Sequence, residues 1–462
     1  MRSSLRTRRA RARRRAPCPT ASAPRPSTWR QPPVIVLTTR RKTLALIALA
    51  LGGFGIGSTE FVAMGLLPNI AQDLLPGLYA QSSDQGIAQA GWLVSAYALG
   101  VVVGAPTIAA MSSHLPKKKL LMGLLALFVV GTVLSAVLPT FGWVLGARFF
   151  AGLPHGAYFG IASIVAATIM GPGNRGKGVA LVLSGLTIAN VIGVPSITAL
   201  GQAQGWRAAY LAVAAIFALT FVAVALAVPR MEGDSSASMR RELSAFGKPQ
   251  VWLVMGIGAI GFGGFFAVYS YIANAVTEGA GVGEGVVPWV LVGVGVGMTI
   301  GNVIGGWASD KNLKAALTVG FVGLIAALVA YALLVDGIVG IFVTTFFLGL
   351  VSSMIGPSVQ SRLMEVAGES QVIGAALNHS SMNLGNSAGA YLGGAVIAAG
   401  FGFAAPGWVG VVLALVGVVL TVTSFRLQKT GDARQAALCA AASEADHKED
   451  TDTGSVFVVQ GR

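Results

Sequence analysis

The sequence predicts an all-α polytopic membrane protein with twelve transmembrane helices, arranged as two six-helix pseudo-repeats. Of the 462 residues, 54% are hydrophobic and 11% are charged, whereas about 25% are charged in soluble domains. Gly accounts for 62 residues, and Gly is more frequent in transmembrane helices than in soluble ones. The chain also contains twelve apolar runs, each long enough to cross the roughly 30 Å of hydrocarbon in a bilayer. This composition excludes a water-soluble enzyme, a disordered protein and a disulfide scaffold.

The first 39 residues differ from the rest of the chain. They contain ten Arg and no acidic residue, and they lack apolar periodicity, so we expect a disordered extension. Two interpretations are open: a leader that resembles a transit peptide, or an over-extended start of the reading frame. A secretory signal peptide is not expected, because the first hydrophobic run, from Thr43, is long enough to be the first span.

The apolar runs predict helices, because a backbone in lipid must satisfy its own hydrogen bonds. The expected spans are 43–68, 87–111, 118–138, 142–170, 177–200, 207–229, 250–275, 286–308, 313–334, 338–362, 371–399 and 404–427. The predicted regions are the extension 1–39, an N-terminal half 40–229, a linker 230–248, a C-terminal half 249–428 and a disordered cytoplasmic tail 429–462.

Basic residues are concentrated in alternate loops. One set of loops holds Arg40, Arg41, Lys42, Lys117, Lys118, Lys119, Arg175, Lys177, Arg230, Arg240, Arg241, Lys248, Lys311, Lys314, Arg362, Arg426 and Lys429. The other set holds Arg207 and the acids Asp73, Asp84, Glu278, Glu284 and Asp336. The positive-inside rule therefore predicts a multi-pass protein of the inner (cytoplasmic) membrane with both termini cytoplasmic. Most of the net charge of +14 comes from the Arg-rich first 39 residues, so it does not indicate a nucleic-acid partner.

The two halves resemble each other. Phe149–Leu153 in the fourth span recurs as Phe346–Leu350 in the tenth, and Asn190 in the fifth span aligns with Asn386 in the eleventh. Repeated six-span halves predict a substrate site between them, near the middle of the membrane, with alternating access by rocking of the halves.

The loops after the second and eighth spans carry a family signature. Gly305-Gly306-Trp307-Ala308-Ser309-Asp310-Lys311 resembles the Gly-x-x-x-Asp-Arg-x-Gly-Arg-Arg motif of the major facilitator superfamily; in the first copy, Ser113 and His114 replace the acid and the first base. The resemblance implies a cytoplasmic latch formed by acidic and basic side chains at the helix ends. The candidate gating residues are Lys117, Lys118, Asp310 and Lys311. These charges could instead be ordinary flanking residues of the spans.

The resemblance to the superfamily covers nearly all of 43–428. Motifs in the first and fifth spans are similar to those of one branch of it. Residues 57–68, GSTEFVAMGLLP, are similar to a pattern of the drug:proton antiporter branch, in particular the bacterial arabinose-efflux and chloramphenicol-resistance permeases. Gly185, Gly193 and Pro195 lie in a stretch that resembles the antiporter motif Gly-x-x-x-Gly-Pro, with Ala189 in place of the first Gly and the Pro one position late. Small residues and a Pro would allow close packing and a bend, and simple packing is the alternative role.

Two ionisable residues within spans are candidates for proton coupling. An ionised carboxylate at Glu60, near the middle of the first span, would cost about 3 kcal/mol or more in lipid, so Glu60 could carry a proton between the two sides. The alternative is a neutral Glu that hydrogen-bonds for packing. Arg148 matches the span-4 Arg that the superfamily uses in proton transfer. It would pair with an acid such as Glu60 or with carbonyl groups, or it would extend to the membrane interface.

Other polar and aromatic residues within spans could line a substrate cavity. The candidates are Asn190, His155, His379, Asn386 and Tyr269. Hydrogen bonds between helices, or packing, are the alternative roles.

The resemblance implies proton-coupled export of small amphipathic compounds, such as chloramphenicol-type drugs. The alternatives are an arabinose-like sugar or purine nucleoside exporter of the same fold, and a non-transporting membrane sensor. We expect no enzymatic activity and no cofactor, with the proton gradient as the energy source. No metal is expected either, because the two cysteines, Cys18 and Cys439, lie in the tails. The expected partners are a small-molecule substrate, protons and the lipid bilayer, and we expect a monomer.

Overall fold

A computed structural model gives the fold of residues 38–112, 115–171, 174–231, 244–368 and 370–454. The chain separates into two units, and residues 35–424 form the larger one. Every regular element among the described residues is helical. The expected extension lies outside the described residues up to residue 37, and so do 232–243 of the linker and Ser113 and His114 of the signature loop.

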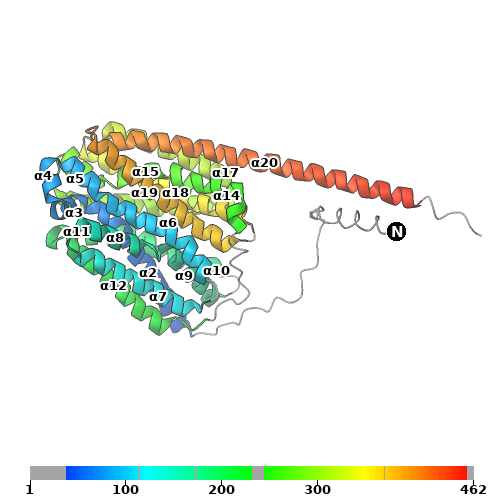
Figure 1. The fold of residues 1–462 in the computed structure, drawn as a ribbon, viewed down its shortest axis with the longest axis horizontal. Helices are drawn as coiled ribbons and strands as arrows, with labels where there is room; N and C mark the ends of the chain where they lie inside the picture. The colour runs from blue at the N-terminus through cyan, green and yellow to red at the C-terminus, as the bar shows by residue number, and fades with distance from the viewer. Residues whose placement is uncertain (1–37, 113–114, 172–173, 232–243, 369, 455–462) are drawn as a thin grey trace, which may run out of the picture. The chain divides into compact units, whose positions relative to one another are not determined.

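The N-terminal half forms six spans, several of them built from more than one helical segment (Figure 1). Its elements are α2 (Thr39–Gly65), α3 (Leu67–Leu74), α4 (Pro76–Gln81), α5 (Ser83–Ala90), α6 (Trp92–Ser112), α7 (Lys117–Val137), α8 (Phe141–Gly152), α9 (His155–Met170), α10 (Arg175–Ile188), the π-turn η1 (Ala189–Gly193), α11 (Val194–Gln204) and α12 (Trp206–Ala227). The pairs α5–α6 and α8–α9 and the series α10–η1–α11 each make one span. Gly205, with φ of 90°, joins α11 to α12 in a left-handed conformation that favours Gly.

The C-terminal half repeats this arrangement. Its elements are η2 (Ser244–Gly247), α14 (Pro249–Gly256), η3 (Ile257–Gly261), α15 (Gly263–Tyr269), α16 (Ile272–Asn274), η4 (Ala275–Gly279), η5 (Glu284–Val286), α17 (Val287–Leu334), α18 (Ile338–Ala367), α19 (Gln371–Ala398) and α20 (Ala405–Gly454). The long helix α17 contains two spans, which meet at a non-helical residue, Asn312 (φ −157°, ψ 94°).

The described residues confirm twelve spans. Ten helical segments are long and apolar enough to cross a membrane. One of them, Glu284–Leu334, has 51 residues, about twice what a span needs, and breaks at Asn312. The 28-residue α19, the eleventh span in chain order, brings the number to twelve.

Two expectations are corrected by the structure. The tail was expected to be disordered from residue 429, but α20 continues to Gly454; this stretch is rich in Ala, the best helix former. The sequence places Arg362 in a loop, but it lies within α18 and is fully buried. Its Nη1 donates to Glu365 Oε2 at 2.9 Å, and its Nη2 donates to Ser424 Oγ at 3.1 Å, because a buried guanidinium needs partners.

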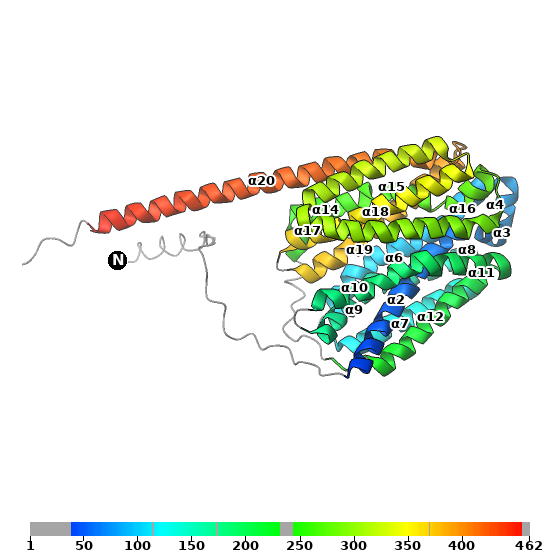
Figure 2. The same ribbon diagram turned by 180° about the vertical axis from the view of Figure 1, so that it is seen from behind.

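The two halves meet along two seams, one between α6 and α19 and the other between α11 and α17 (Figures 1 and 2). Cross-seam hydrogen bonds support this contact: Ser95 Oγ donates to the carbonyl oxygen of Ser387 at 3.1 Å, and Ser380 Oγ donates to that of Val102 at 3.3 Å. The seams bring side chains from both halves together around the middle of the unit.

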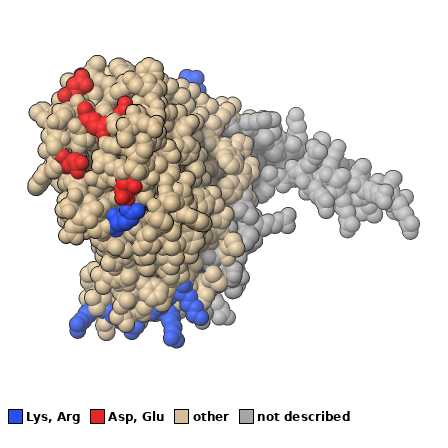
Figure 3. Space-filling model, turned by 60° about the vertical axis from the view of Figure 1, so that its left-hand side comes forward, with Lys and Arg blue, Asp and Glu red and all other residues tan. Residues whose placement is uncertain are grey.

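Charges separate the two ends of the spans. The basic end carries Arg40, Arg41, Lys42, Lys117, Lys118, Lys119, Lys311 and Lys314, and the acidic end carries Asp73, Asp84, Glu278, Glu284 and Asp336. Figure 3 shows the acidic side chains together in the upper part of one face and most basic side chains along its lower edge.

At the acidic end, Asp73 accepts hydrogen bonds from Arg207 and from the indole of Trp206, the latter at 3.0 Å. Partial burial works to raise the pKa of Asp73, but these hydrogen bonds and the charge of Arg207 outweigh it and lower the pKa.

Candidate functional site

Glu60 lies in the last two turns of α2, closer to the acidic end than the sequence suggested. Its side chain is only 6% exposed. Asn386 of α19 donates from Nδ2 to Glu60 Oε1 at 3.5 Å. An acid of the N-terminal half therefore receives a hydrogen bond from an amide of the C-terminal half, so its surroundings depend on how the halves are placed.

Arg148 is fully buried in α8 and does not extend to the membrane interface. Its Nη1 donates to Thr59 Oγ1 at 3.1 Å, and its Nη2 donates to the Thr59 carbonyl oxygen at 3.0 Å. The guanidinium also lies over the rings of Tyr97 (4.4 Å) and Tyr210 (5.3 Å). In the part of the chain that the structure describes, Arg148 and Glu60 do not form an ion pair. Of the expected partners, Arg148 therefore uses a carbonyl group.

A cavity of about 250 Å³ lies between the halves, with Glu60 in its lining. One part of the lining is aromatic and is formed by Phe61, Phe262, Phe265 and Phe266. Amides and hydroxyls form another part, and they include Asn190, Ser352, Gln360, Asn378 and Asn383. Such a cavity can hold a ligand with one apolar face and several hydrogen-bonding groups.

Two histidines line the cavity from opposite halves. His155 Nδ1 is 3.1 Å from Tyr97 Oη, and the His155 ring centroid is 5.6 Å from that of His379. The His379 ring stacks on Phe159, with 5.2 Å between centroids. Tyr97 thus contacts both His155 and Arg148, so it connects the cavity lining with the surroundings of Glu60.

Five residues were predicted from the sequence to face substrate. Asn190, His155 and His379 line the cavity. Asn386 is not part of the lining but hydrogen-bonds Glu60. Tyr269 lies behind the lining, edge-on to Phe61 at 5.6 Å and stacked on Phe265 at 5.0 Å.

Sequence reasoning missed the partners of Arg148. Thr59 was visible as the neighbour of Glu60, but nothing in the sequence shows that its carbonyl oxygen would accept from Arg148. Ser352 and Gln360 were missed too, because a Ser or Gln on an apolar helix carries no signal that distinguishes cavity from packing.

The antiporter-like motif of the fifth span lies where helices pack closely. A Cβ added at Gly185 would collide with the carbonyl oxygen of Ala50, and one at Gly193 would lie 2.8 Å from Ser58 Oγ. Both glycines therefore let the fifth span approach α2. Pro195 is in the first turn of α11, directly after η1, the π-turn that includes Asn190.

The predicted gating residues lie at the basic end, and among the described residues Asp310 does not form an ion pair with Lys117, Lys118 or Lys311. Lys118 Nζ donates to the carbonyl oxygen of Ala225 at 2.7 Å, and Lys311 Nζ lies 4.0 Å from the centre of the Trp307 ring. Lys117 begins α7, with its backbone N–H bonded to the carbonyl of Met231. Asp310 is exposed, and among the described residues no ion pair includes it.

The described residues contain no group of three or more His, Cys, Asp or Glu side chains that could hold a metal ion. The titratable groups in the lining of the cavity are the carboxyl group of Glu60 and the imidazoles of His155 and His379.

Comparisons with known proteins agree with this architecture. The model of the Major Facilitator Superfamily matches residues 49–378 and 273–449. The chain is 35% identical over 383 residues to the inner membrane transport protein YdhP of Escherichia coli K12, covering 83% of this chain and 96% of that protein. It is 29% identical over 381 residues to the chloramphenicol resistance protein of Streptomyces lividans, covering 82% and 95%. The crystal structure of a D-xylose-proton symporter superposes with a TM-score of 0.65 at 17% identity, covering 81% and 97%, and shows the same fold.

Proposed function

The chain belongs to the Major Facilitator Superfamily, and we propose that it exports small amphipathic compounds of the chloramphenicol type across the cytoplasmic membrane in exchange for protons. Members of this family are transporters. In the proposal, both termini are cytoplasmic, the basic end faces the cytoplasm, and the protein works as a monomer by alternating access.

The hydrogen bond between Glu60 and Asn386 is the observation that carries the proposal. A buried carboxyl is far cheaper to keep neutral than ionised, unless water or a donor reaches it. Rocking of the halves would move Asn386 relative to Glu60 and change the cost of the ionised form. Proton uptake and release would then depend on which side the cavity faces.

Arg148 supports this role through its contact with Thr59, the residue before Glu60. Its two hydrogen bonds to Thr59 hold the backbone next to Glu60. We propose that Arg148 positions Glu60 and does not itself release a proton.

The lining of the cavity supports an amphipathic substrate. The four Phe side chains offer an apolar surface for an aromatic ring, and Asn190, Asn378 and Asn383 offer donors and acceptors. The name of the Streptomyces lividans relative is consistent with this class. The amides would also suit a sugar or a purine nucleoside, which remains the second candidate.

Everted membrane vesicles energised by respiration test the proposal. Vesicles that contain the protein should accumulate labelled chloramphenicol, and a protonophore should abolish accumulation; labelled arabinose and a labelled purine nucleoside are the comparisons. Accumulation of the sugar or nucleoside in place of the drug would reassign the cargo. Binding of the drug without accumulation would favour a sensor.

A further inference from the structure

The seam between α11 and α17 carries a groove of about 690 Å³. Its lining shares no residue with that of the central cavity. Most of its lining residues are small or aliphatic and include Val191, Ile192, Pro195, Ala199 and Val292. Small side chains on α11, which include Ser196, Ala199 and Ala203, line the groove on the side opposite α17.

The groove faces lipid. It lies between two membrane-spanning segments, Lys177–Gln204 and Glu284–Leu334. Ile192 is 59% exposed and Trp289 is 67% exposed, so both side chains meet whatever surrounds the protein there. If the groove were empty, its lining would lose dispersion contacts. Water molecules in it would find few hydrogen-bond partners, because most of the lining is apolar. A hydrocarbon chain suits this surface best.

The mouth of the groove carries a negative charge at the level of the headgroups. Glu284 is exposed and begins its span. Asn69 Nδ2 donates to Glu284 Oε2 at 3.4 Å, and Gln202 Nε2 donates to the Glu284 carbonyl oxygen at 3.2 Å. Within the described ranges, no Lys or Arg forms an ion pair with Glu284. Its charge is therefore available to a cationic group from outside the protein.

We propose that this groove is a phospholipid site. An acyl chain lies between α11 and α17, and the primary ammonium of a phosphatidylethanolamine headgroup pairs with the Glu284 carboxylate. Trp289, one turn further into the membrane, packs against the lipid, as Trp does at membrane interfaces. Asn69 and Gln202 belong to the N-terminal half and Glu284 to the C-terminal half, so the lipid binds where the halves meet.

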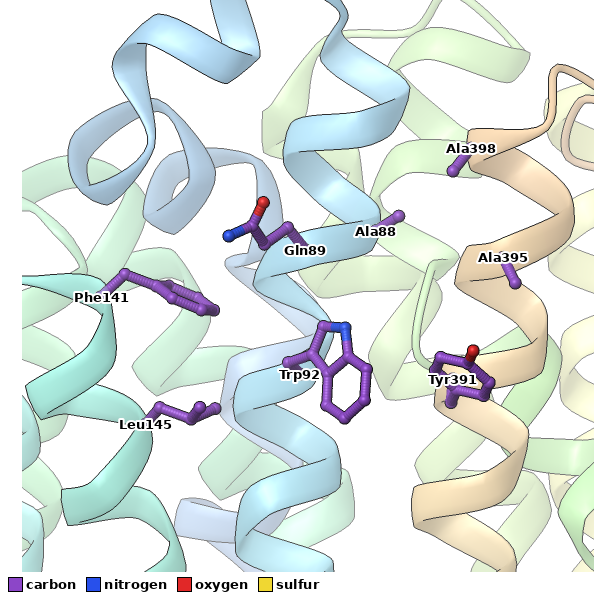
Figure 4. Close-up of a pocket in the computed structure, with 8 residues that line it drawn as sticks. All are labelled: Ala88, Gln89, Trp92, Phe141, Leu145, Tyr391, Ala395 and Ala398. Atoms are coloured by element: carbon purple, nitrogen blue, oxygen red, sulfur yellow. The ribbon is translucent and has the colours of Figure 1, made fainter.

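The opposite seam supplies an internal comparison. A groove of about 410 Å³ lies there between α5, α6, α8 and α19. Figure 4 shows the rings of Trp92 and Tyr391 next to each other in this lining; they meet edge-on, with 5.2 Å between their centroids. The polar groups of this lining are the Gln89 amide, the Tyr391 hydroxyl and the Trp92 indole, and all three are neutral. This groove should accept acyl chains without preferring an ammonium headgroup.

Quenching of Trp289 fluorescence by brominated lipids tests the site. The protein is reconstituted in phosphatidylcholine vesicles that contain a minor fraction of acyl-brominated phosphatidylethanolamine or, in a parallel sample, acyl-brominated phosphatidylcholine. The chain has eight Trp, so the signal of Trp289 is the difference between wild type and Trp289→Phe. We expect about two- to fivefold stronger quenching by the brominated phosphatidylethanolamine, the range that an exposed ion pair gives.

Two charge variants complete the experiment. Glu284→Gln keeps an acceptor for Asn69 but removes the negative charge. It is measured with and without Trp289→Phe, so that the signal of Trp289 is again a difference. This variant should abolish the preference for phosphatidylethanolamine. Asp336→Asn removes an acid at the same end but outside the groove, and should keep the preference. Equal quenching by the two lipids in the wild type would overturn the proposal, and so would a preference that survives Glu284→Gln.

Discussion

The Arg148 guanidinium donates two hydrogen bonds to Thr59, the residue that directly precedes Glu60, at 3.1 and 3.0 Å. The guanidinium of Arg148, in the fourth span, is thus hydrogen-bonded to the residue next to Glu60 in the first span. Among the described residues the two ionisable groups do not form an ion pair, which is consistent with the proposal that Glu60 exchanges a proton while Arg148 holds the backbone beside it.

Replacing Arg148 by Lys should impair transport although the charge is kept. A Lys ammonium lacks the forked geometry that reaches both Thr59 oxygens, and a hydrogen bond to a charged group contributes about 1.5–3 kcal/mol. We expect the export rate to fall at least about tenfold, since 1.4 kcal/mol corresponds to a factor of ten. Arg207→Lys, at the exposed pair with Asp73, is the matched control and should stay near wild type. Equal rates for both variants would contradict this role.

Asn386→Leu should remove the hydrogen bond by which the C-terminal half contacts Glu60. The substitution removes the amide that donates to Glu60 Oε1, while its size stays similar. Without this donor, the ionised carboxylate costs more, and the pH at which export is half-maximal should rise relative to wild type. Asn383→Leu, on the same helix but bonded through Nδ2 to the carbonyl oxygen of His379, is the comparison. The idea fails if both pH profiles coincide with that of the wild type.

The ion pair at the acidic end should make stability depend on pH. The pKa of Asp73 is lowered in the folded protein, so its contribution is fully present above the unfolded value of about 3.9 and is lost as the pH falls through the lower folded value. Its side chain is 47% exposed, so the contribution is about 1 kcal/mol or less. The difference in Tm between wild type and Asp73→Asn in detergent should shrink between neutral pH and pH of about 3. A difference that grows on acidification would contradict the assignment.

Two Gly→Ala substitutions should have different effects on Tm. Gly185→Ala places a methyl group against the carbonyl oxygen of Ala50 and forces the fifth span away from α2, so Tm should fall. At Gly146, in α8, nothing lies within 4 Å of an added Cβ, and Ala is about 0.5–1 kcal/mol better than Gly within a helix. Thermal unfolding in detergent should therefore show an unchanged or raised Tm for Gly146→Ala. A loss of Tm in both variants would point to a general intolerance of the fold.

The sequence predicted the spans well, because the length of an apolar run is set by the bilayer and is read directly from the residues. It could not predict how spans are interrupted: the fourth span is divided just before His155, and the fifth contains a π-turn at Ala189–Gly193. Such breaks depend on packing between helices. Disorder was expected after residue 429, but the Ala-rich stretch there favours a helix, and α20 continues through it to Gly454.

The candidate site was predicted in part. Glu60 and Arg148 were found because charges within apolar runs are rare, and His155, His379 and Asn190 were found as polar residues on apolar helices. Their mutual arrangement was not, since Arg148 bonds to both the hydroxyl and the backbone oxygen of Thr59 and Asn386 hydrogen-bonds Glu60 from outside the lining. Tyr97, which contacts both His155 and Arg148, belongs to an aromatic class that is common in packing and carries no distinctive signal.

Proton coupling by Glu60 is the central claim, and a comparison of two transport modes in proteoliposomes tests it most directly. Export against a gradient, driven by an imposed pH difference, requires Glu60 to exchange its proton, whereas exchange of labelled for unlabelled substrate at equal pH requires only rocking of the halves. Glu60→Gln, a permanently neutral side chain, should abolish uphill export and keep substrate exchange. Uphill export by Glu60→Gln at the wild-type rate would contradict the account.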